Sequence, residues 1–256
     1  MFVDEELSES FVDILKLLEV KQKHNLTDHA FNDILNIFTN GEISLHSAKK
    51  KLSNLVNLQP VFIDMCINSC CAFTGQLTND LSCHWCGQNR FIIENQNKNP
   101  RKVASFFPLI DRFKLQFNDP QRALALRYRH EYVTNENYED DNIGDLFDGN
   151  LYKELVDDGY FSDERDIALI GSTDGYQIFR QKTDDCWIVM FINSNLSPNE
   201  RFKKQNLLIS LVIPGPKQPK NFNSFLKPVI DELKILEGNN LSIYNILVLL
   251  QYISFI

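Results

Sequence analysis

The sequence predicts an α+β protein: a helical N-terminal region, an inserted four-cysteine knuckle, then three antiparallel strands, a helix and a strand. Three observations predict this class. Apolar residues before residue 57 recur at helical spacing. Five of the six cysteines lie between Cys66 and Cys86. After residue 145, apolar residues gather in short runs bounded by turn residues, which is typical of strands.

The chain has 256 residues and is 43% hydrophobic, so it can bury a substantial core. Its net charge of -8 excludes a wholly basic nucleic-acid clamp but permits a local basic face. The expected domains are a helical region (1–57), a zinc-binding knuckle (58–92), a second helical region (93–132), an acidic linker (133–145) and a partial α/β core (146–256).

Neither end of the sequence predicts export or membrane insertion. Residues 1–7 are acidic where a signal peptide would be cationic, so we expect an intracellular protein. Residues 238–256 carry no charge, but they fall short of the ~20 largely apolar residues of a spanning helix and include Asn239 and Asn240. We therefore expect no membrane partner.

The region before the cysteines reads as three helices. Helical spacing joins Phe11 to Leu18 and Phe31 to Phe38, and Thr27 or Asp28 can cap the second of these helices. A third helix is expected over 45–56, with the basic run 49–51 on its exposed side. That run is typical of a solvated face.

A helical pair is expected over 108–117 and 119–130, because Asp119-Pro120 supplies an N-cap and a first-turn proline. The second helix is basic. Arg127 and Arg129 are candidate contacts to DNA phosphates, although such a stripe also arises as ordinary surface. The polar run 135–142 has no apolar period and predicts the linker.

Beyond the linker the pattern predicts strands over 167–170, 186–192 and 207–213, a helix over 222–236 and a strand over 246–250. Three consecutive strands are easily joined as an antiparallel meander. A strand that returns after a crossover helix lies parallel in the same sheet. This order is the opening half of a ribonuclease H-like fold.

The cysteine spacing predicts one structural zinc ion held by Cys66, Cys70, Cys83 and Cys86. Four thiolates fill a tetrahedral site, so the zinc would stabilise the fold and do no chemistry. Two alternatives stay open: the cysteines are buried free thiols, or Cys71 replaces Cys70. His84 would strain the turn as a ligand, and the remote Cys186 reads as a small buried hydrophobe.

A composite of motifs resembles the CACTA (En/Spm-type) transposases from about residue 23 to about residue 236. Its parts occur in the family's order: 66–90, 101–130, Phe147-Asp148-Gly149, Ser172-Thr173-Asp174-Gly175, Cys186-Trp187, 193–198, 213–219 and 225–233. The family's register favours Cys70 over Cys71. The resemblance implies a nuclear DNA transposase of the DDE type, whose ribonuclease H-like core cuts and joins strands with two Mg²⁺ or Mn²⁺ ions.

Asp174 matches the family's first catalytic acid by its place in the Ser-Thr-Asp-Gly motif. Taken alone, Asp174-Gly175 also reads as a hairpin turn. The resemblance makes transposon-end DNA the expected partner, with Arg127, Arg129 and Lys217 as weak candidate contacts.

The sequence has no acidic residue after Glu237, so the family's second and third acids have no counterpart. One carboxylate cannot hold two hard metal ions. We therefore expect a truncated transposase that is inactive alone. The alternative is a non-catalytic zinc-stabilised module that binds DNA or protein, with a full-length transposase or a second copy as a further partner.

Overall fold

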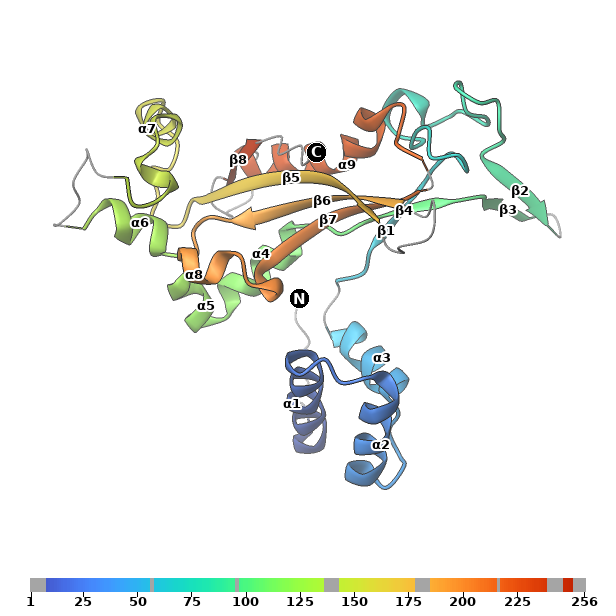
Figure 1. Ribbon diagram of the computed structural model, residues 1–256, viewed down its shortest axis with the longest axis horizontal. Helices are drawn as coiled ribbons and strands as arrows, with labels where there is room; N and C mark the ends of the chain where they lie inside the picture. The colour runs from blue at the N-terminus through green and yellow to red at the C-terminus, as the bar shows by residue number, and fades with distance from the viewer. Residues whose placement is uncertain are drawn as a thin grey trace. The chain divides into compact units, whose positions relative to one another are not determined.

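The computed structural model describes residues 8–55, 58–94, 97–135, 143–177, 185–215, 217–238 and 246–250 (Figure 1). The chain divides into two compact units, residues 1–59 and 60–256. Each unit has its own core and is described by itself.

The first unit consists of α1 (Glu9–Lys23), α2 (Asp28–Thr39) and α3 (Leu45–Leu55), as the apolar periodicity predicts. Thr27 caps α2 by accepting a hydrogen bond from the backbone N–H of Ala30 at 3.2 Å. Asn40 ends α2 in the left-handed conformation, at φ 50°. The buried core is Phe11, Ile14, Phe31, Leu35, Leu45 and Ala48.

The second unit is built on a six-stranded sheet with the order β1-β4-β7-β6-β5-β8. Its strands are β1 (Val61–Asp64), β4 (Val103–Phe106), β5 (Ile167–Gln177), β6 (Asp185–Asn193), β7 (Leu207–Pro214) and β8 (Ile246–Leu250). β5, β6 and β7 form an antiparallel meander, and β8 pairs parallel to β5. The predicted meander and the predicted parallel return are thus confirmed.

Two strands of this sheet were missed by the sequence analysis, which expected only a knuckle and helices between residues 58 and 132. β1 and β4 pair antiparallel, and β4 extends the sheet beyond β7 through Ser105 and Phe106. Each strand has four residues, too few to show an alternating pattern. A separate hairpin, β2 (Phe91–Glu94) with β3 (Asn97–Pro100), follows the cysteines.

Helix α9 (Phe222–Gly238) covers one face of the sheet and closes the main core (Figure 1). Its Glu232 is buried and accepts hydrogen bonds from the N–H groups of Leu109 (2.7 Å) and Ile110 (2.9 Å), at the start of α4 (Ile110–Asn118). Burial raises the pKa of the Glu232 carboxyl. This one side chain therefore fastens α4 to α9.

The second predicted helix, 119–130, is broken into α5 (Pro120–Ala125) and α6 (Tyr128–Val133). Asp119 caps α5 as predicted, accepting from the N–H groups of Gln121 and Arg122. The helix breaks at Leu126, whose carbonyl accepts a hydrogen bond from the amide of Asn195 at 3.1 Å. A tertiary contact that no local pattern reveals thus sets this boundary.

The remaining described helices are η1 (Gly75–Leu77), η2 (Leu146–Asp148), α7 (Asn150–Asp157), α8 (Pro198–Arg201) and η3 (Lys204–Asn206). The predicted linker 133–145 lies mostly outside the described residues. Of its described ends, Val133 closes α6 and Asp145 caps η2.

Candidate metal centre and the predicted catalytic position

Four cysteine sulfurs meet at one point of the second unit. The Sγ atoms of Cys66, Cys70, Cys83 and Cys86 all lie within 4.8 Å of one another, and those of Cys66 and Cys86 are 3.4 Å apart. Zn–S bonds of about 2.3 Å in a tetrahedron place sulfurs about 3.8 Å apart, so the arrangement fits zinc. This is the set that the spacing predicts, and the four thiols can hold a metal ion.

Two tight turns bring the sulfurs together. The N–H of Ser69 donates to the carbonyl of Cys66, and the N–H of Gly87 donates to the carbonyl of Cys83, both at 2.8 Å. Ser69 and Gly87 both have positive φ, at 60° and 69°, a region that favours glycine. The N–H of Asn68 also points at the Cys66 sulfur, at 3.4 Å. The sulfurs are thus oriented by the backbone.

Cys71 lies beside the cluster but outside the four-sulfur group. Its Sγ is 3.9 Å from that of Cys83, and its carbonyl accepts a hydrogen bond from the N–H of Cys66. The geometry therefore favours Cys70 as the fourth member. Cys186 is buried on β6, as its reading as a small hydrophobe requires.

Burial raises the pKa of the Cys66 and Cys70 thiols and raises that of Cys71 to about 12. Cys86 differs: burial opposes ionisation, but hydrogen bonds from the Gln88 backbone and the Asn68 side chain lower its pKa to about 6. Metal binding by such thiols must release protons.

The cysteine segment is fastened to the loop between β7 and α9. The carbonyl of Cys70 accepts hydrogen bonds from the N–H groups of Lys220 (3.0 Å) and Asn221 (2.9 Å). The Ser69 hydroxyl donates to the carbonyl of Pro214 at 3.0 Å. The N–H of Ala72 donates to the Ser224 hydroxyl at 2.9 Å. The knuckle is therefore packed onto the sheet domain.

Asp174 lies inside β5, paired with Ile188, and not in a hairpin turn. Ile167 and Leu169 of β5 pack in the core that α9 closes, so the alternation of the strand places Asp174 on the opposite face, where it is exposed. Among the described residues, no group of three or more metal-binding side chains includes Asp174. The structure thus places one carboxylate on an open sheet face.

Arg129 was a candidate DNA contact, and this prediction is wrong. Its side chain is 1% exposed, and its guanidinium donates to the carbonyls of Asp166 (3.0 Å) and Asp163 (2.6 Å) and to the Tyr152 hydroxyl (3.0 Å). All three acceptors belong to the segment 152–166, so the Arg129 guanidinium connects α6 to the residues that precede β5.

The other two candidate DNA contacts are accessible. Arg127 forms an ion pair with Glu164, which reduces its use as a phosphate contact. Lys217 is exposed in the loop after β7. DNA binding by either side chain stays a prediction.

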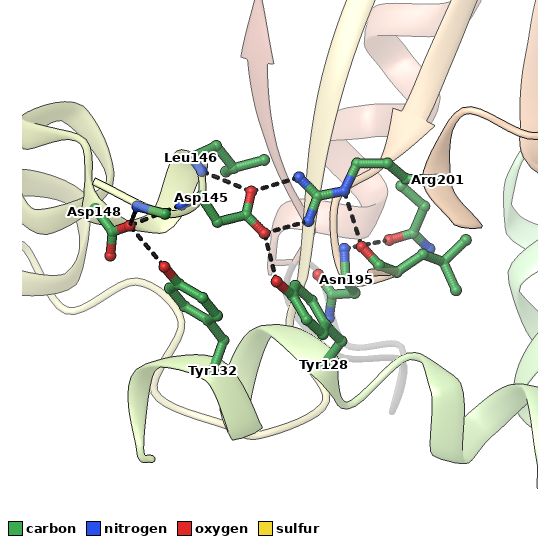
Figure 2. A network of polar contacts seen from close by, with 10 residues as sticks. Tyr128, Tyr132, Asp145, Leu146, Asp148, Asn195 and Arg201 are labelled. Atoms are coloured by element: carbon green, nitrogen blue, oxygen red, sulfur yellow. Dashed lines mark hydrogen bonds and ion pairs between the residues drawn. The ribbon is translucent and has the colours of Figure 1, made fainter. Parts of the chain in front are cut away.

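A buried polar network that sequence reasoning missed joins α6, η2 and α8 (Figure 2). Arg201 forms a two-pronged ion pair with Asp145, with both N···O distances 2.7 Å. Its Nε donates to the Leu196 carbonyl at 2.9 Å. Asp145 also accepts a hydrogen bond from the Tyr128 hydroxyl at 2.8 Å. Burial is the main cause that raises the pKa of Tyr128, and this hydrogen bond is the second cause.

The same network holds the neighbouring acid. Asp148 accepts from the Tyr132 hydroxyl and from the N–H groups of Gly144 and Asp145, at 2.7, 2.7 and 2.8 Å. These groups bond to one another inside the protein, so the network supports the fold. In the sequence, Asp145 is one acid of the predicted linker and Arg201 is an arginine after Pro198, and no local pattern links the two.

Taken together, the second unit is a mixed α/β domain with an attached site that can bind metal. Residues 141–248 match the model of the transposase family tnp2. The matched segment includes η2, α7, the meander β5 to β7, α9 and part of β8. This match supports a transposase family for the matched segment. A comparison with curated proteins found no match.

None of the helices in the described part of the chain is long and apolar enough to cross a membrane.

Proposed function

We propose that the chain is a DNA-binding protein derived from a CACTA-type DDE transposase, with a ribonuclease H-like sheet and a structural zinc site. The observation that carries this proposal is the strand order β7-β6-β5-β8 within the segment that matches the transposase family. An antiparallel meander followed by a crossover helix and a parallel strand beside the first strand is how a ribonuclease H-like sheet begins.

The proposed role of zinc is to hold the two cysteine turns against the loop before α9. The four sulfurs support it by their distances, and no open position remains for a catalytic water. Elemental analysis of the purified protein should find one zinc per chain. Cys83→Ser and Cys86→Ser should lower the zinc content and the melting temperature, whereas Cys186→Ala should keep the zinc. A metal-free wild type would refute the site.

In the proposed core, Asp174 is the first acid of a two-metal site. Mg²⁺ or Mn²⁺ ions need several convergent carboxylates, and the described residues form no group of three or more metal-binding side chains that includes Asp174. The chain alone should therefore not cleave DNA. The test is a nuclease and strand-transfer assay in Mg²⁺ and in Mn²⁺, with Asp174→Asn as the control. Cleavage that survives this substitution would refute the role of Asp174.

A second candidate function is that of a non-catalytic module that binds DNA or a full-length transposase, and the isolated position of Asp174 favours it. Transposition brings DNA ends together in the nucleus, so a nuclear location and an assembly partner form part of this proposal. The candidates are separated by adding the protein to an active transposase relative and measuring the relative's strand transfer. A binding module should change this strand transfer, and the Asp174→Asn variant of the chain should cause the same change.

A further inference from the structure

The loop between β7 and α9 carries two lysines that no described acidic side chain neutralises. Lys217 and Lys220 are exposed, and neither forms an ion pair with a described residue. Residues 214–221 contain no acidic residue. By contrast, Lys203 and Lys227 elsewhere in the same unit are paired with Glu200 and Asp231.

A third ammonium group stands where this loop meets the cysteine segment. Lys102 follows β3, and its Nζ lies 3.1 Å from the Ser69 hydroxyl and donates to the Gly215 carbonyl. The two acids of the cysteine segment are engaged elsewhere, Asp64 with Arg90 and Asp80 with His84. Positive charge therefore gathers around the joint of the loop and the knuckle.

An exposed aromatic ring stands on the same knuckle. Trp85 lies between Cys83 and Cys86, is 39% exposed, and belongs to none of the hydrophobic clusters of the described residues. Large aromatic rings normally bury their area in cores or interfaces. The four-sulfur cluster joins the Trp85 turn to Cys70, whose carbonyl holds the N–H of Lys220. The Trp85 ring and the loop that carries Lys217 and Lys220 are therefore both attached to the cysteine cluster.

The opposite end of the sheet repels a polyanion. The segment 143–166 holds eight acidic and two basic residues, and it stays net negative although Arg127, Arg129 and Arg201 bind it from outside. It forms η2 and α7, which lie at the far end of the sheet from the cysteine segment (Figure 1). The resulting field directs negatively charged partners to the knuckle end of an otherwise acidic protein.

From these observations we infer that Trp85, Lys102, Lys217 and Lys220 form a knuckle surface that binds single-stranded DNA. The exposed ammonium groups of Lys217 and Lys220 contact phosphates, and Lys102 adds positive charge beside them while it keeps its hydrogen bonds to Ser69 and Gly215. The indole stacks on a base, which only an unpaired strand presents. This inference rests on the proposed function as a DNA-binding protein. It adds the location of the contact and the form of the DNA.

The surface depends on the metal through the backbone. The two hydrogen bonds from Lys220 and Asn221 end on the carbonyl of a metal-binding cysteine. Removal of the metal frees this cysteine turn and with it the loop that carries the lysines. Chelation should therefore weaken DNA binding at least as strongly as loss of both loop lysines.

Fluorescence anisotropy with a labelled oligonucleotide tests the surface. Lys217→Gln/Lys220→Gln should weaken binding about tenfold and reduce the salt slope by about 1.4, because single strands lose about 0.7 per phosphate contact. Trp85→Ala should weaken binding roughly tenfold and Trp85→Phe should restore most of it. Lys204→Gln, an exposed lysine at the other end of β7, is the matched control and should stay within about twofold.

The outcomes separate the surface from the proposed function. If wild type binds DNA and the knuckle variants, with zinc retained, bind like Lys204→Gln, the surface is wrong and the proposed function stands. If duplex binds as tightly as single strand and Trp85→Ala has no effect, the stacking is refuted. If wild type binds no DNA in either form, the proposed function fails as well.

Discussion

The ion pair of Arg201 and Asp145 offers the sharpest test of the packing between α6, η2 and α8. Both side chains are 4% exposed, and the guanidinium also lies over the rings of Tyr128 and Phe147. Arg201→Met preserves much of the side-chain volume but removes the charge and its donors. Asp145 is then left buried with hydrogen bonds from the Tyr128 hydroxyl and from the backbone N–H groups of Leu146 and Asp148.

Removing one partner of a buried ion pair costs about 3–5 kcal/mol. The three remaining hydrogen bonds to Asp145 place the expectation at the lower end, about 3 kcal/mol. For a unit of this size, each kcal/mol shifts the melting temperature by about 2–4 °C. Arg201→Met should therefore melt about 6–12 °C below wild type.

Urea unfolding followed by circular dichroism measures this cost. The double variant Asp145→Asn/Arg201→Met removes both charges and should recover about 2 kcal/mol relative to the sum of the single changes. Arg165→Met is the matched control, because Arg165 pairs with Asp163 at the surface and should cost under about 1 kcal/mol. A loss below 1 kcal/mol for Arg201→Met, or additive single changes, would show that the pair does not organise this region.

Three further predictions test other parts of the structure. Glu232→Ala should cost about 2–4 kcal/mol in urea unfolding, since two buried N–H groups lose their acceptor, whereas Glu232→Gln should cost far less. Because burial raises the folded pKa of Glu232, its contribution to stability is present below the unfolded value of about 4.3 and falls as the pH rises through the folded pKa. The Gln variant should lack this decline, and an identical pH profile would contradict the assignment. Arg129→Met should cost about 3–5 kcal/mol, since several carbonyls lose a buried charged donor, and an unchanged melting temperature would restore Arg129 as a surface residue. Leu35→Ala should cost the first unit about 2–5 kcal/mol. Amide hydrogen exchange should detect this loss without a change in β5 and β6, and a shared loss would contradict two separate cores.

The sequence was sufficient for elements whose cause is local. The helices of the first unit follow from apolar spacing and the Thr27 cap, and β5 to β8 follow from runs between turn residues. The cysteine cluster was predictable for a similar reason, because two close pairs on tight turns satisfy tetrahedral coordination almost regardless of the fold around them.

Features caused by distant contacts were not predictable. Arg129 occupies a position that reads as helix surface, and only the fold reveals that residues 161–166 cover it. The break at Leu126 depends on Asn195, from the turn after β6. Arg201 and Asp145 lie far apart in sequence, and nothing in either local pattern marks them as partners.

The insertion of the cysteines between β1 and β4 has a consequence for the order of folding. Asp64 pairs with Val103 although the segment 65–102 separates them, so closing this hairpin carries the entropy cost of a long loop. A metal that joins Cys66 to Cys86 early would shorten the loop that the two strands must close. Refolding with zinc present should then be faster, and β1 should pair with β4 before β4 pairs with β7.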